Sequence, residues 1–185
     1  VDNIPGTVAD GQGQISHIDL PSADRIEVLR GPFSVLYGNS SGGVISVFSE
    51  DGGPKNIVQP YFELGSYSQR KVGIKTSGIY KNTNYLLDVG DFHTNGYRIH
   101  SAADRFNANS KLKFQPSSST NITLVANNVN LTAQDPLGLT ASQLVANPKQ
   151  AGNNAISQNT RKSVLQTQTG MTIEDRKSTR LNSSH

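Results

Sequence analysis

The strongest constraint on the fold is a run of about 120 residues in which polar and apolar side chains alternate. A period of two places successive side chains on opposite faces of a β-strand. The alternating segments are each about ten residues long, the length that a tilted strand needs to cross a bilayer, and turn-forming residues separate them. The expected strands are residues 57–67, 70–80, 84–92, 105–114, 121–130 and 161–174.

Alternation alone leaves open which face of the expected sheet is wet. In a soluble sandwich the apolar row would be the core, whereas in an outer-membrane barrel it would face lipid and the polar row a wet lumen. The connections favour the barrel, because after the first hairpin they alternate between short and long, and residues 131–160 form a loop of about thirty residues. Residues 105–114 illustrate the two rows, with Phe106, Ala108, Leu112 and Phe114 in one and Asn107, Asn109, Lys111 and Lys113 in the other.

Composition agrees with strands that have one wet face. Hydrophobic residues make up 34% and charged residues 17% of the chain, and much of the remaining polarity is uncharged. The absence of cysteine excludes a disulfide framework, a cysteine-ligated zinc site and a thiol nucleophile.

The last eleven residues, DRKSTRLNSSH, match a common sequencing adapter codon for codon, so we interpret residues 175–185 as an artefact and leave them out of the fold argument. This segment holds three basic residues and one acidic residue, so without it the formal net charge of +3 falls to +1. The chain therefore gives no charge-based argument for a nucleic-acid partner.

Catalytic and cofactor motifs are also lacking. His93 and His100 lie seven positions apart without the spacing of a metal-binding helix, and the glycine-rich stretch at residues 38–43 is not followed by the GK[ST] of a phosphate loop. Ser34 and Ser46 do not stand in the GxSxG pattern of a nucleophile elbow. We therefore predict neither an enzyme nor a cofactor or metal site.

The segment before the alternating run has a different organisation. Residues 25–29 and 44–48 are expected strands, and Pro32 at a first helical position favours a short helix through Tyr37 between them. The turn at residues 49–54 is the expected boundary, which divides the chain into residues 1–53 and 54–174.

The stretch Asp24–Val47, DRIEVLRGPFSVLYGNSSGGVISV, resembles the plug-domain signature of TonB-dependent outer-membrane receptors. VDNIP and DGQG near the N-terminus are similar to the upstream plug. AQDPLGLT (Ala133–Thr140) and NTRKSVLQTQ (Asn159–Gln168) are similar to an outer loop and the next strand of siderophore-receptor-like members.

The resemblance implies a mainly β fold. Residues 1–53 would be the C-terminal part of a small α+β plug domain, and residues 54–174 the N-terminal part of a transmembrane β-barrel, about six of the family's roughly 22 antiparallel strands. The chain would thus be a fragment located in the outer membrane of a Gram-negative bacterium. Because barrel closure removes unpaired strand edges, we expect these residues alone to form no functional pore.

The resemblance also implies a function without catalysis. TonB, with its inner-membrane energising complex, would pull on the plug and admit a scarce ligand, most often a ferric siderophore. Outer-membrane lipid would be the other partner, with no nucleic acid and no cofactor. Two alternatives remain at this point, a passive outer-membrane porin and a β-rich binding protein that does not require TonB.

Particular residues follow from the motif. Among the charged ones, Arg25, Glu27 and Arg30, we expect some to pair with carboxylates of the barrel wall and so hold the plug. The glycines would serve turns and close backbone approach. The complete motif set is Arg25, Glu27, Arg30, Gly31, Pro32, Tyr37, Gly38, Gly42 and Gly43. Ligand candidates in the loop after residue 94 are Tyr97, Arg98 and His100, with arginine suited to an anionic siderophore.

Overall fold

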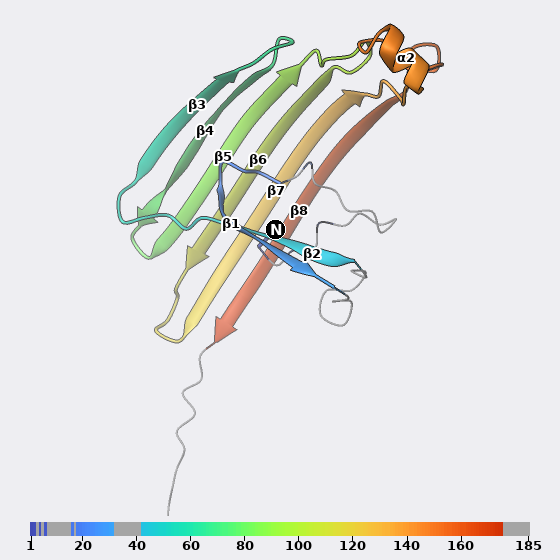
Figure 1. Cartoon of the computed structure of the whole chain (residues 1–185). Helices are drawn as coiled ribbons and strands as arrows, with labels where there is room; N and C mark the ends of the chain where they lie inside the picture. Colours follow the sequence, from blue (N-terminus) through green and yellow to red (C-terminus); the bar gives the residue numbers. More distant parts are fainter. Residues whose placement is uncertain (3, 5, 7–15, 17, 32–41, 176–185) are drawn as a thin grey trace, which may run out of the picture.

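A computed structural model of the chain describes residues 1, 2, 4, 6, 16, 18–31 and 42–175. These residues form two antiparallel sheets and one short helix. The smaller sheet is a hairpin that lies against one face of a larger, curved sheet (Figure 1). We refer to the larger sheet as the wall, to its hairpin-bearing face as the inner face, and to the opposite face as the outer face.

The hairpin joins β1 (Ala23–Arg30) to β2 (Gly43–Ser49), which confirms both strands expected in the first region. Two glycines stand where β1 ends and β2 begins, and both have positive φ angles that favour glycine, 122° at Gly31 and 145° at Gly43. A Cβ on Gly43 would also meet the Leu29 carbonyl oxygen at 2.5 Å. The motif therefore needs glycine at both positions.

The wall is a meander in which each strand pairs with its sequence neighbour. All six expected strands are present. β7 continues past Asn130 because its last residues find partners on both β6 and β8. The strands are β3 (Ile57–Leu64), β4 (Arg70–Tyr80), β5 (Thr83–Thr94), β6 (Ala103–Phe114), β7 (Thr120–Gln134) and β8 (Arg161–Asp175).

The two faces of the wall differ in the way a membrane barrel requires. On the inner face, polar side chains are buried beneath the hairpin, Asn107, Asn109 and Lys111 among them. The apolar row faces away from the hairpin and is exposed, which is the opposite of a sandwich core. Its members include Val58, Phe62, Leu64, Val72, Ile74, Leu87, Phe106, Leu112, Leu124, Leu165, Met171 and Ile173.

Among the described residues, apolar burial is concentrated at the contact between hairpin and wall, and Ala155 in the connection between β7 and β8 is buried apart from it. At the contact, Val47 of β2 meets Leu86 of β5 and Val125 of β7, and all three side chains are buried. Within the described ranges, no helix is long and apolar enough to span a membrane.

The two longest connections, residues 95–102 and 135–160, lie at the same end of the wall (Figure 1). Residues 65–69, 95–102 and 135–160 connect strands at that end, while residues 81–82 and 115–119 make the turns at the other. The expected alternation of short and long connections is therefore confirmed. The longest loop is not structureless, because α2 (Ala141–Ala146) forms within it behind a capping box of Thr140 and Gln143.

Candidate functional site: the contact between hairpin and wall

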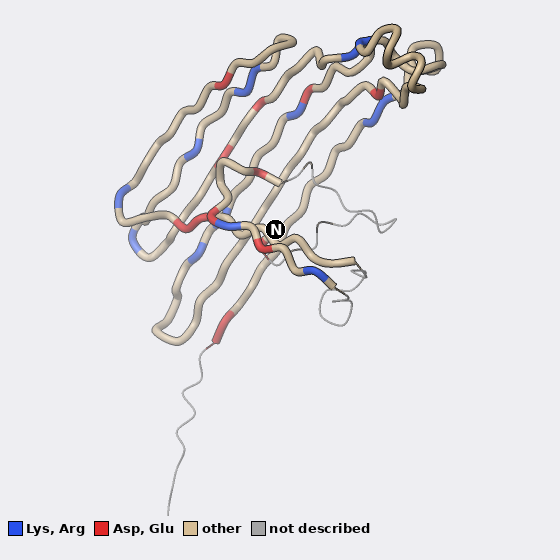
Figure 2. The backbone as a smooth tube through the Cα atoms, viewed as in Figure 1, with Lys and Arg blue, Asp and Glu red and all other residues tan. Residues whose placement is uncertain are grey.

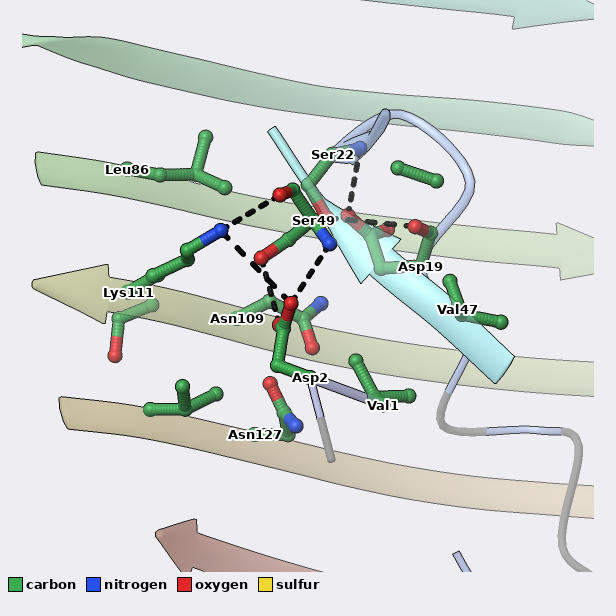
Figure 3. A pocket seen from close by; sticks show the side chains of 13 residues that line it. Val1, Asp2, Asp19, Ser22, Val47, Ser49, Leu86, Asn109, Lys111 and Asn127 are labelled. Atoms are coloured by element: carbon green, nitrogen blue, oxygen red, sulfur yellow. Dashed lines mark hydrogen bonds and ion pairs between the residues drawn. The ribbon is translucent and has the colours of Figure 1, made fainter. Parts of the chain in front are cut away.

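A buried lysine is at the centre of the contact between hairpin and wall (Figure 3). Lys111 rises from β6 and is only 7% exposed. Its ammonium lies 2.7 Å from a carboxylate oxygen of Asp51 and donates to the Ser49 carbonyl at 2.7 Å. Asp2 contributes a further carboxylate 3.8 Å away, and Ser49 in turn donates to Asp2 from its backbone N–H and its hydroxyl. A charge so deeply buried is stable because these groups satisfy it.

A second lysine repeats this arrangement two strands away, on β4. Lys75 of β4 pairs with Glu50 at 3.1 Å and donates to the Pro21 carbonyl at 3.0 Å. It is also buried, and the hydroxyl of Ser77 on the same strand donates to Glu50 at 3.5 Å. The chain segments on both sides of the hairpin are thus fastened to β4.

Hydrogen bonds to the Asp19 side chain complete the contact. The Asn107 amide donates to Asp19 at 3.0 Å, and the other oxygen of Asp19 accepts the Ser22 backbone N–H at 3.2 Å. Within the wall itself, Asp88 of β5 is fully buried and accepts a 3.0 Å hydrogen bond from the Tyr61 hydroxyl of β3. With the apolar packing on Leu86 and Val125, the contact of the hairpin region reaches four strands of the wall, β4 to β7.

In these ion pairs, the two partners carry the opposite charges to those that we expected, which were arginines on the hairpin and carboxylates on the wall. The hairpin region supplies the carboxylates and the wall supplies the lysines, and Figure 2 shows these charges gathered where the hairpin crosses the wall. Arg25 lies in ion pairs with Asp24 and Glu27 of its own strand. Among the described residues, Arg25 therefore pairs within the hairpin and not with a wall carboxylate as predicted.

The remaining motif residues fall into two groups. Arg30 pairs through its backbone with Gly43 at the end of the hairpin, and Gly42 has open space where a Cβ would stand. Pro32, Tyr37, Gly38 and the expected helix lie outside the described residues. Their roles stay predictions.

The three ligand candidates lie in a network of loops. Arg98 donates to the carbonyls of Leu137, Pro136 and Gln150 at 2.7–3.0 Å, so its guanidinium binds the longest loop rather than open solvent. The His100 ring nitrogen lies 2.9 Å from the Thr160 carbonyl. Tyr97 packs edge-to-face on Tyr67, is 47% exposed, and is thus the candidate with the most accessible ring.

We expect Arg98→Lys to loosen the loop at residues 135–160. Lysine cannot span three carbonyls as the planar guanidinium does, and hydrogen bonds to a charged group contribute about 1.5–3 kcal/mol each. Hydrogen exchange of residues 136–150 should become faster by at least about tenfold, which corresponds to the loss of one such bond. Arg161→Lys is the matched control, because Arg161 reaches one carbonyl, that of Asn159, at 3.3 Å. Equal exchange in the two variants would contradict the role of Arg98.

Acid should weaken the contact at Asp51. Burial would raise the pKa of this carboxyl, but hydrogen bonds and charges from Lys111 and Lys113 outweigh burial and hold the pKa below its ordinary value of 3.8. The pair therefore stabilises docking above pH 3.8 and loses that contribution as the pH falls through the lowered pKa. Protease protection of the hairpin should drop in that acid range, and Asp51→Asn should remove the step. If Asp51→Asn lost protection over the same acid range as the wild type, the loss would be due to the titration of another group.

The wall lysines and their carboxylate partners were not predicted as site residues. The sequence indicated only their position, because Lys111 and Lys113 stand in the polar row of their strand. A lysine in a wet row is ordinary, and only the position of the hairpin shows that Lys111 is buried. No cluster of three or more His, Asp or Glu side chains suited to a metal ion occurs in the described part of the chain.

The fold and contact define a class of protein, a β-barrel wall with an N-terminal domain docked on its inner face. Residues 1–44 match the family of the TonB-dependent receptor plug domain. This match confirms the resemblance to TonB-dependent receptors.

Solved structures extend the likeness to the wall. The siderophore receptor PiuA from Acinetobacter baumannii matches with a TM-score of 0.54 and 16% identity over 62% of this chain and 17% of that chain. The copper transporter OprC matches with a TM-score of 0.57 and 19% identity over 70% of this chain and 22% of that chain. The unliganded ferric citrate transporter FecA matches with a TM-score of 0.59 and 22% identity over 73% and 22%. This chain therefore spans about a fifth of the length of the structures that share its fold.

Proposed function

We propose that the chain is part of an outer-membrane transporter that TonB energises, and that its cargo is a ferric siderophore. The observation that supports this most is a plug-domain sequence at residues 1–44 whose hairpin lies on the polar face of an outward-apolar sheet. Residues 1–53 then act as the plug part and residues 54–174 as the first part of the barrel. The protein moves its ligand and catalyses no reaction.

Iron is favoured as the cargo by two of the similar structures, a siderophore receptor and a ferric citrate transporter. The copper transporter among them makes copper the comparison that the experiment must include. A passive porin fits less well, because the hairpin covers the inner face of the wall and is fastened there by Lys75 and Lys111.

Uptake by the full-length receptor tests this proposal. Cells that depend on it for iron should take up a labelled ferric siderophore, and deletion of TonB or a protonophore should abolish the uptake. Uptake that persists without TonB would indicate a passive pore. If uptake required TonB but carried copper and no ferric siderophore, the cargo would be copper and the siderophore assignment would be wrong. A receptor that reaches the outer membrane but takes up neither ligand would contradict the transport role.

A further inference from the structure

Three successive residues at the end of β2 connect the hairpin to two different parts of the molecule. Glu50 and Asp51 hold the ion pairs with the lysines of the wall. Ser49, the residue before them, donates its backbone N–H and its hydroxyl to the carboxylate of Asp2 (Figure 3). This short stretch is therefore bonded both to the wall and to the N-terminal segment, by which we mean the described residues 1, 2 and 4.

Two hydrogen bonds to one carboxylate join Asp2 to Ser49. The backbone N–H of Ser49 donates at 2.9 Å and its hydroxyl donates to the other carboxylate oxygen at 2.6 Å. Asp2 also donates its own N–H to the Val47 carbonyl at 2.8 Å, and its side chain is only 9% exposed. Hydrogen bonds to an ionised group in a buried site are among the strongest in proteins, so Asp2 and Ser49 should move together.

The N-terminal segment is held in one defined position. The backbone of Asp2 is in the left-handed region, with a φ of 47°, which aspartate adopts more readily than most residues but which still needs support from its surroundings. The hydrogen bonds of its N–H and carboxylate supply that support. Ile4 lies against the wall, where a Cβ added to Gly170 of β8 would meet its side chain.

A displacement of the N-terminal segment acts on both fastening carboxylates through the backbone. If Asp2 moves, Ser49 follows, and Glu50 and Asp51 are the next two residues of the chain. The ion pairs of these two carboxylates, 3.1 and 2.7 Å from the nearest lysine ammonium groups, then lengthen together. Hydrogen-bonded contacts weaken steeply with distance, so a small displacement is enough to open both.

We propose that Asp2 is a coupling residue through which displacement of the N-terminal segment releases the hairpin from Lys75 and Lys111. The inference rests on the proposed function, in which TonB pulls on the plug. It adds the point at which that pull reaches the ion pairs. Asp2 acts through Ser49 and is therefore a positioning residue.

The reactivity of a cysteine beneath the hairpin region reports this release whatever the cargo is. Ser77 of β4 is 1% exposed and its hydroxyl donates to Glu50, and the chain has no native cysteine. The parent for the test is a full-length receptor with Ser77→Cys as its only cysteine. It should react with N-ethylmaleimide faster in energised cells that contain TonB than in cells that lack it.

Two substitutions of Asp2 separate the link to Ser49 from the charge. Asp2→Ala removes both hydrogen bonds and should reduce the TonB-dependent increase in labelling by about tenfold, within the usual range of coupling between sites. Asp2→Asn should retain the increase, because the amide can still accept from the N–H and donate to the hydroxyl of Ser49. Asp24→Ala is the matched control, since Asp24 is an exposed carboxylate that pairs with Arg25 of its own strand.

Labelling without TonB distinguishes coupling from simple fastening. In cells that lack TonB, Asp2→Ala should react as slowly as the parent receptor, because Glu50 and Asp51 keep their lysines. Fast labelling of this variant without TonB would show that Asp2 only fastens the hairpin, and would overturn the inference. Parent-like labelling of Asp2→Ala with TonB, or an Asp2→Asn variant as defective as Asp2→Ala, would overturn it as well. All variants are compared at equal amounts of receptor in the outer membrane.

The uptake experiment separates this inference from the proposed function. If uptake requires TonB but TonB leaves the labelling of the parent receptor unchanged, the hairpin stays on the wall during transport, and only the inference is wrong. If neither uptake nor labelling depends on TonB, the proposed function and the inference are both wrong.

Discussion

Replacing Lys111 by methionine should loosen the plug hairpin from the wall by about 3 kcal/mol, the lower part of the range for breaking a buried ion pair. Methionine keeps the length of the side chain but removes the charge that Asp51, Asp2 and the Ser49 carbonyl surround. Asp51 is half exposed and keeps Lys113, which limits the loss. In the full-length receptor the variant should admit large antibiotics that the wild type excludes, and the plug should unfold at a lower denaturant concentration.

Lys113→Met is the matched control for this experiment. Lys113 stands on the same strand and pairs with the same carboxylate, but its side chain is 39% exposed. An exposed pair contributes about 1 kcal/mol or less. The two variants should therefore differ clearly, and equal permeability and equal plug stability would contradict the assignment of Lys111 as the main fastening.

Gly73→Ala should destabilise the wall by about 3 kcal/mol through overpacking and a lost hydrogen bond. The Tyr61 ring lies over Gly73 and the neighbouring Gly90, and a Cβ on Gly73 would overlap that ring and the Val89 carbonyl oxygen. Displacing Tyr61 would remove the hydroxyl that donates to Asp88, whose second carboxylate oxygen is buried without a hydrogen bond. Denaturant unfolding of the receptor, followed by its heat-modifiable mobility in gels, measures the loss.

Gly138→Ala provides the comparison, because nothing lies within 4 Å of the Cβ that it adds. Its effect should stay within about 0.5 kcal/mol, as for most surface substitutions. If Gly73→Ala were equally mild, Tyr61 would have room to move, and the close packing of ring and glycines would carry no stability.

The strands and their order followed from the sequence, because they depend on local features. Alternation of period two and the turn residues near positions 81 and 117 located every strand of the wall. The Asp24–Val47 motif indicated the plug family, and the family match over residues 1–44 confirmed it. The helix α2 was missed because its six residues show no helical apolar period, and its capping box is the only local signal.

Only the tertiary structure decided which face of the wall is polar and buried beneath the hairpin, and which partner each charged side chain has. The same alternation fits a sandwich and a barrel, and the two differ only in what lies against each face. The sequence marked Arg25 and Arg98 as charges available to a wall or a ligand, but Arg25 pairs within its own strand and Arg98 binds three carbonyls of a distant loop. Lys111 became a fastening residue because the hairpin lies over it, and that contact joins residues about sixty positions apart, beyond the reach of any local pattern.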